Sequence, residues 1–187
     1  MVTALFVAVV LVAMLALVNL ALTLTIVKRM RSQHSHAGPT IVATAADSLP
    51  AGSRVPDFTA TATDGTEFTA EHLGMGRTLV AFASETCQSC HEDLPTLIAY
   101  ANDFVRDGGR VIAAVLTRPP ADGSDAGEGS VAAALRDVAT VFVDIEGDAV
   151  VSDAFSVTGY PTYLIVQDRV VDEVLLTIRD LPVLARG

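Results

Sequence analysis

The sequence predicts one α/β domain, with a mixed sheet flanked by helices, behind a single N-terminal transmembrane helix. Three observations lead to this prediction. Residues 2–27 contain no charged side chain. Two apolar, strand-like runs, 79–83 and 111–116, are separated by a stretch whose apolar residues recur at helical spacing, the pattern of a βαβ unit. The only two cysteines, Cys87 and Cys90, stand between the first run and that helix.

Residues 2–27 are predicted to be a retained transmembrane anchor. As a helix, these 26 residues would span about 39 Å, more than the ~30 Å hydrocarbon core requires. A cleaved secretory signal has a basic n-region and an apolar region of roughly 7–15 residues, and this segment has neither. Lys28, Arg29 and Arg31 follow it and argue for a cytoplasmic domain by the positive-inside rule. Because disulfides persist outside the cytoplasm, we expect instead a single-pass protein of the cytoplasmic membrane with an extracytoplasmic domain.

The charge of the chain changes sign along its length. All 22 acidic residues lie at Asp47 or beyond, together with nine arginines, so this part carries a net charge of −13 (9 minus 22). Such a surface repels nucleic acid, which is excluded as a partner. Residues 28–54 are predicted to be a basic flank and a flexible linker, since their small and polar residues show no clear period. His34 and His36 in this linker lack the further ligands that a metal site needs.

The domain itself is predicted to span residues 55–179. A turn at Asp64-Gly65 between two short β-prone runs predicts an N-terminal hairpin. The later elements are predicted from apolar periodicity and from turn residues, in chain order as strand 79–83, a helix ending near 107, strand 110–116, helix 131–138, strand 140–143, a helical turn within 148–155, and an antiparallel pair 163–166 and 170–178. Residues 180–187 are expected to form a short C-terminal tail.

The spacing of Cys87 and Cys90 predicts a redox-active disulfide. A thiolate attacks a disulfide sulfur and forms a mixed disulfide. The unpaired N–H groups and the dipole at a helix N-terminus stabilise an anion at Cys87, which is therefore the predicted nucleophile. Cys90, one turn later, is predicted to resolve the mixed disulfide. This chemistry needs no cofactor and no metal.

A haem-carrying protein is one alternative. The segment Cys87-Gln-Ser-Cys90-His91 matches the C-x-x-C-H signature of c-type haem attachment. The iron would need a second axial ligand, usually Met or His, but neither residue type occurs after His91. Met75 and His72, both upstream, are the nearest candidates. A haem-carrying or non-catalytic scaffold protein is therefore the lesser alternative.

Pro161 is the second candidate feature. The segment Gly159-Tyr160-Pro161-Thr162 enters a predicted strand, a suitable place for a cis peptide bond, although an ordinary trans turn stays open. A cis-Pro161 facing the thiols would leave the backbone of Tyr160 open for strand-like pairing with a substrate peptide. Tyr160 and Thr86, the residue before Cys87, are the predicted substrate contacts.

These motifs together resemble a known family. The matching segments are G-x-x-V-P-D-F at 52–58, Asp64-Gly65, 86–90, Pro95 and 160–162. From residue 52 to residue 178 the chain resembles the thioredoxin superfamily, specifically the membrane-anchored TlpA/ResA-like thiol–disulfide oxidoreductases, and looks most similar to MauD, a methylamine-utilisation accessory protein. The resemblance implies a thioredoxin-like fold, a nucleophilic first cysteine and a cis proline. It also implies a reductase or maturation role toward protein cysteines, with electrons from an upstream membrane or soluble donor.

The sequence departs from this family near the cysteines. Thr86 stands where the family often has an aromatic residue, and no acid lies in the preceding strand, where thioredoxin keeps a buried Asp; Glu85 is nearest. The start at 56–58 is shared with peroxiredoxins, whose site reads P-x-x-x-T/S-x-x-C. Ser84 fits this pattern, but Val80 stands where proline is needed. A peroxiredoxin-like thiol peroxidase is therefore the main alternative.

Overall fold

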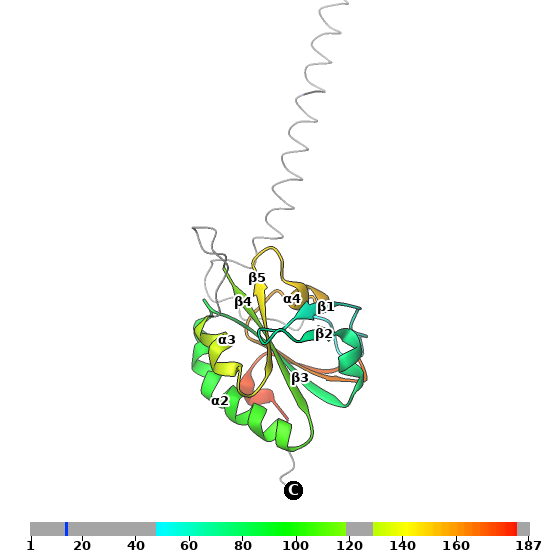
Figure 1. Ribbon diagram of the computed structural model, residues 1–187, viewed down its shortest axis with the longest axis vertical. Coiled ribbons are helices and arrows are strands. Elements are labelled where there is room, and N and C mark those ends of the chain that lie inside the picture. Colours follow the sequence, from blue (N-terminus) through cyan, green and yellow to red (C-terminus); the bar gives the residue numbers. More distant parts are fainter. Residues whose placement is uncertain (1–13, 15–47, 119–128, 183–187) are drawn as a thin grey trace, which may run out of the picture. The chain divides into compact units, whose positions relative to one another are not determined.

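The computed structural model describes residue 14 and residues 48–118 and 129–182 (Figure 1). Apart from residue 14, the predicted anchor at 2–27 lies outside the described residues. So do its basic flank, the linker up to residue 47 and the end of the C-terminal tail. Within the described part of the chain, none of the helices combines the length and the apolarity needed to cross a membrane.

A five-stranded mixed sheet, in the order β5-β4-β3-β6-β7, forms the centre of the domain. The strands are β3 (Arg77–Ser84), β4 (Arg110–Thr117), β5 (Thr140–Ile145), β6 (Thr162–Gln167) and β7 (Val170–Leu175). The first three are parallel to one another, whereas β6 is antiparallel to β3 and β7 is antiparallel to β6. The predicted βαβ unit and the final antiparallel pair are both confirmed.

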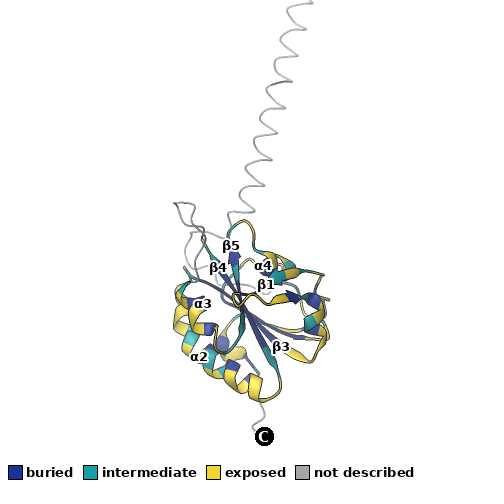
Figure 2. Ribbon diagram, in the orientation of Figure 1, coloured by how far each residue is buried: buried dark blue, intermediate teal, exposed yellow. Residues whose placement is uncertain are grey.

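The central strand β3 is buried on both faces. Its successive side chains point to opposite sides of the sheet. Leu79, Ala81 and Ala83 join one core cluster, and Val80 and Phe82 join the other. All five are at most 5% exposed, which explains why the sequence of this strand is continuously apolar (Figure 2).

Two helices cover one face of the sheet (Figure 1). They are α2 (Gln88–Arg106), which follows β3, and α3 (Ser130–Leu135), which precedes β5. Leu97, Ala101 and Phe104 recur at helical spacing on α2 and are nearly fully buried. The long helix predicted after the cysteines is therefore confirmed.

The opposite face is covered by the N-terminal hairpin and by α4 (Val150–Ala154). Strands β1 (Thr59–Thr61) and β2 (Glu67–Thr69) pair antiparallel, as predicted, in a separate two-stranded sheet. Gly65 has a φ of +84° in their turn, a conformation that glycine adopts without strain. A 3₁₀ helix, η2 (Ala70–Gly74), follows the hairpin.

The folded part extends beyond both predicted domain boundaries. The N–H of Leu49 donates to the carbonyl of Phe155 at 2.8 Å, so residues 48–54, predicted to be linker, are bonded to the domain. At the other end, Leu181 is 8% exposed and belongs to the core, although it lies in the predicted tail 180–187. The boundaries predicted from residue composition were too narrow, because backbone hydrogen bonds and burial of apolar side chains decide where the fold ends.

Candidate active site

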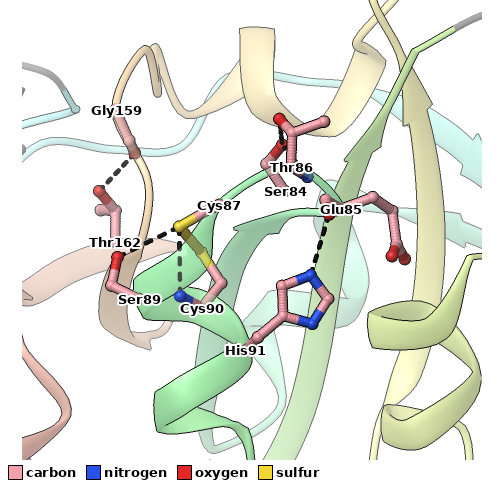
Figure 3. Close-up of a disulfide and its surroundings, with 9 residues drawn as sticks. All are labelled: Ser84, Glu85, Thr86, Cys87, Ser89, Cys90, His91, Gly159 and Thr162. Atoms are coloured by element: carbon pink, nitrogen blue, oxygen red, sulfur yellow. Dashed lines mark hydrogen bonds between the residues drawn. A yellow bond between two sulfur atoms is a disulfide. The ribbon is translucent and has the colours of Figure 1, made fainter. Parts of the chain in front are cut away.

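Cys87 and Cys90 form a disulfide where β3 gives way to α2 (Figure 3). Their Cα atoms are 5.2 Å apart. Strand β3 ends at Ser84 and helix α2 begins at Gln88, so a turn of three residues carries Cys87 to the helix N-terminus. The predicted pairing of the two cysteines is present in the structure.

The two sulfur atoms have different surroundings. The Sγ of Cys87 accepts the N–H of Cys90 at 3.2 Å and lies 3.3 Å from the hydroxyl oxygen of Ser89. After reduction, these donors would stabilise a thiolate on Cys87, as the free N–H groups of a helix N-terminus generally do. Cys87 is half-buried, whereas Cys90 is 4% exposed. A partner can therefore reach the sulfur of Cys87 more easily.

His91 supports the turn that leads into the helix. Its Nε2 lies 2.9 Å from the carbonyl oxygen of Glu85, to which it donates in the Nε2–H tautomer (Figure 3). In this arrangement the residues of the C-x-x-C-H pattern have other partners: the sulfurs of Cys87 and Cys90 bond to each other, and the imidazole bonds to the main chain. Nothing in this arrangement favours haem attachment.

Glu85 is bound by helix α3 and not by the thiols. Its carboxylate accepts the N–H groups of Val131 and Ala132, each at 3.1 Å, and lies 3.3 Å from the hydroxyl of Ser130. Figure 3 shows the carboxylate turned away from the disulfide, toward this helix. Glu85 therefore does not replace the buried acid of thioredoxin, as its position next to the loop indicated.

Replacing Glu85 with alanine should lower the free energy of unfolding by about 1–2 kcal/mol, the usual effect of removing a helix cap. Gly129→Ala should act in the same direction, because an added Cβ would overlap the Glu85 carboxylate. Urea unfolding of each variant measures the loss. Glu92→Ala is the control, since Glu92 is exposed and its carboxylate accepts from Gln88 on the surface of α2. A loss at Glu85 no larger than at Glu92 would contradict the assigned role.

Asp144 is a buried acid that the sequence did not reveal, and it lies at the sheet end where β3 leads into the turn with Cys87. Asp144 is 3% exposed, and its carboxylate accepts the N–H groups of Val151 at 3.2 Å and Ser152 at 2.7 Å. Burial raises the pKa of Asp144, while these hydrogen bonds oppose the increase. In the sheet, Asp144 lies beside Leu116, which lies beside Ser84 at the end of β3. A single acid in an otherwise apolar strand, just before a helical turn, was the available signal.

The stability of the domain should depend on pH through Asp144. The pKa of Asp144 is raised on folding. Its contribution to stability is therefore complete at a pH below the unfolded-state pKa of 3.8 and is lost as the pH rises through the folded-state pKa. In Asp144→Asn this contribution is absent. Urea unfolding from pH 4 to 7 should therefore show the variant gaining relative to the wild type as the pH rises. Asp172→Asn, at an exposed site, is the control, and a difference that stays constant for Asp144→Asn would contradict the prediction.

The peptide bond between Tyr160 and Pro161 is cis, which confirms that prediction. The hydroxyl of Thr162 donates to the carbonyl of Gly159 at 2.8 Å, across the proline (Figure 3). The hydroxyl of Tyr160 donates to Ser152 Oγ at 3.4 Å, so this side chain extends into the fold. The placement of Pro161 against the thiols stays a prediction.

Thr86 is exposed directly before the nucleophile position. Its hydroxyl lies 3.2 Å from that of Ser84, within a short turn that also carries Cys87. The side chain is thus at the surface beside the disulfide, where a partner could contact it. The predicted substrate contacts of Thr86 and Tyr160 stay predictions.

The described domain is similar to several solved structures. The thioredoxin domain of a thiol–disulfide oxidoreductase from Bacteroides vulgatus is 17% identical, with a TM-score of 0.51 over 67% of this chain and 88% of that chain. A thiol:disulfide interchange protein from a Bacteroides species is 18% identical, with a TM-score of 0.53 over 71% and 86%. A secreted disulfide oxidoreductase from Mycobacterium tuberculosis, homologous to E. coli DsbE, is 17% identical, with a TM-score of 0.50 over 64% and 83%. The domain has a thioredoxin-like fold.

At these identities the similarity establishes the fold. It therefore confirms the thioredoxin-like fold that the resemblance implied. No protein-family model matches the chain, and no curated protein matches it.

Proposed function

We propose that this chain is a thiol–disulfide oxidoreductase that exchanges disulfides with protein cysteines. The observation that carries the proposal is the Cys87–Cys90 disulfide at the N-terminus of α2 in a thioredoxin-like fold, with one sulfur accessible and the other buried. An isolated structural disulfide between residues three apart closes too short a loop to stabilise the fold much. The pair is therefore better explained by chemistry than by structure.

The exchange follows from the positions of the two sulfurs. In the reduced protein, the Cys87 thiolate attacks one sulfur of a client disulfide, forms a mixed disulfide and releases the first client thiolate. Cys90 then loses its proton and attacks Cys87 Sγ. This step forms the Cys87–Cys90 disulfide and releases the second client thiolate. The client gains two electrons and the pair loses two.

We assign the protein to a reductase or maturation role of the TlpA/ResA-like or MauD-like kind. An upstream dithiol protein, in the membrane or in solution, would return the pair to its reduced state. The family resemblance of segments 52–58, 86–90 and 160–162 supports this assignment. The opposite direction of electron flow uses the same residues and is distinguished by the reduction potential of the pair.

We further propose that residues 2–27 anchor the protein in the cytoplasmic membrane and that the domain works on the outer side. The uncharged length of this segment supports the anchor. The persistence of disulfides outside the cytoplasm supports the location, although Lys28, Arg29 and Arg31 argue for the opposite orientation. Attaching a membrane-impermeant biotin label to an added surface lysine in intact cells tests it: labelling supports an outer domain, and labelling only after lysis contradicts it.

The activity is tested with the reduced full-length protein in detergent micelles or nanodiscs. An oxidised protein with accessible disulfides is added, the reaction is quenched with acid, and free thiols of both partners are alkylated and counted by mass spectrometry. We expect each client disulfide reduced to be matched by one Cys87–Cys90 disulfide formed. Consumption of hydrogen peroxide without exchange would support a thiol peroxidase instead. Covalent haem absorbance in the purified protein would support the haem-carrying alternative.

A further inference from the structure

We propose that Asp144, acting through Ser152, is a positioning residue for Tyr160 and so fixes the segment 160–162 against which a protein client is held during exchange. Asp144 lies at the end of β5, Ser152 in α4, and Tyr160 directly before Pro161. The inference rests on the proposed function, because a positioning role presupposes a client. It goes further by assigning a role to a buried acid that the exchange chemistry itself does not use.

Hydrogen bonds connect Asp144, Ser152 and Tyr160 in series. The backbone N–H of Ser152 donates to the carboxylate of Asp144 at 2.7 Å, and the hydroxyl of Tyr160 donates to Ser152 Oγ at 3.4 Å. An ionised carboxylate can only accept, so Asp144 holds the backbone of Ser152, and the Ser152 hydroxyl oxygen in turn accepts from Tyr160. Hydrogen bonds arranged in series in a buried site strengthen one another.

The carboxylate at the end of this chain is held by hydrogen bonds. Asp144 and Ser152 are 3% and 1% exposed. The charged and titratable groups that act on Asp144 or on Tyr160 in this region are Asp153 of α4 and the two residues themselves. Asp153 opposes ionisation of Asp144, so the N–H groups of Val151 and Ser152 are what stabilise the carboxylate. Removing one donor would leave buried polar atoms unsatisfied, which makes the arrangement rigid.

The chain of hydrogen bonds connects the edge of the sheet to the segment with the cis proline. Val157 donates its N–H to the carbonyl of Ser152 at 2.8 Å. The polypeptide backbone is thus bonded back to α4 three residues before Tyr160. Tyr160 packs against both core clusters; one of these contains Cys90, and Cys87 also packs against it. Tyr160 is therefore held from the interior, against the same cluster as the two cysteines.

Helix α3 provides an internal comparison. Its first N–H groups are accepted by Glu85, as the first N–H groups of α4 are accepted by Asp144. The carboxylate of Glu85 bonds to the hydroxyl of Ser130 and to the first backbone N–H groups of α3, and not to Tyr160. A substitution at Glu85 thus removes a similar helix cap without breaking the hydrogen-bond chain to Tyr160.

A double-mutant cycle on the full-length protein tests the proposal. Asp144→Asn, Tyr160→Phe and the double variant are assayed with an oxidised protein client and, separately, with a small disulfide, oxidised glutathione. We expect each single substitution to raise the KM for the protein client about 3- to 10-fold, with a less than 2-fold change for oxidised glutathione. The KM of the double variant should be no higher than the higher of the two single-variant values, because both substitutions break the same connection. Glu85→Gln combined with Tyr160→Phe should give multiplied effects.

The outcomes separate this inference from the proposed function. Multiplied effects of Asp144→Asn and Tyr160→Phe, or equal losses with the protein client and oxidised glutathione, would overturn the positioning role. If Asp144→Asn fails to fold, Ser152→Ala takes its place, since it removes the linking hydroxyl and keeps the N–H donor. Tyr100→Phe, which loses a hydroxyl bonded to the carbonyl of Pro182, should leave KM unchanged. A wild type that exchanges with no protein client overturns the proposed function and this inference together.

Discussion

Replacing Cys90 with alanine should abolish turnover and leave the protein covalently joined to its client. Cys87, whose sulfur is the more exposed, would still attack a client disulfide. Without the second thiol, the mixed disulfide cannot be resolved from within the protein. Cys87→Ala should also abolish turnover but form no adduct. Non-reducing gels and mass spectrometry of the adduct measure both results, and Thr96→Ala, at an exposed site on the same helix, is the matched control.

The adducts also identify the clients. When it is expressed in cells, the Cys90→Ala variant should capture secreted or periplasmic-type client proteins through their cysteines. Capture of cytoplasmic thioredoxin partners alone would overturn the proposed membrane orientation. Adducts formed by Cys87→Ala and not by Cys90→Ala would reverse the assignment of nucleophile and resolving thiol, and the absence of any adduct would contradict a protein substrate.

The elements of this fold could be predicted because their sequence patterns are local. The run at 79–83 is uniformly apolar because β3 is central and buried on both faces. Leu97, Ala101 and Phe104 repeat at helical spacing because a single face of α2 packs on the sheet. In both cases the pattern lies within one short segment of the sequence, so periodicity was sufficient to predict the strand and the helix.

The contacts that complete the site could not be predicted in the same way. Glu85 bonds to Val131, 46 residues away, and Tyr160 bonds to Ser152 across a turn. A pattern of apolar residues does not report which distant backbone N–H groups a carboxylate will meet. The role of Asp144 could not be predicted for the same reason, because it depends on where α4 returns to the sheet.

A large loss of stability is expected at Phe155, on the face of the sheet that carries α4. Its side chain is fully buried. The ring centroid lies 6.0 Å from that of Phe58 and 5.3 Å from that of Phe82. Its carbonyl accepts the N–H of Leu49 at 2.8 Å. One residue therefore joins the N-terminal segment, the start of the hairpin and the central strand.

Phe155→Ala should lower the free energy of unfolding by about 3–5 kcal/mol, because it removes buried apolar contacts and leaves a cavity among rings that cannot close it. Urea unfolding should show a lower midpoint with an unchanged slope. Val150→Ala, in α4 at a site that is 40% exposed, should change stability by no more than about 0.5 kcal/mol.

Phe155→Leu separates the two sources of this loss. Leucine keeps most of the buried volume but removes the ring contacts with Phe58 and Phe82. If the cavity dominates, Phe155→Leu should retain most of the stability, whereas a loss near that of alanine would assign the effect to the aromatic contacts. A loss below about 1 kcal/mol in Phe155→Ala would contradict the burial of this ring. Because a domain of this size is stabilised by about 5–15 kcal/mol, the loss in Phe155→Ala should be a substantial share of the total stability.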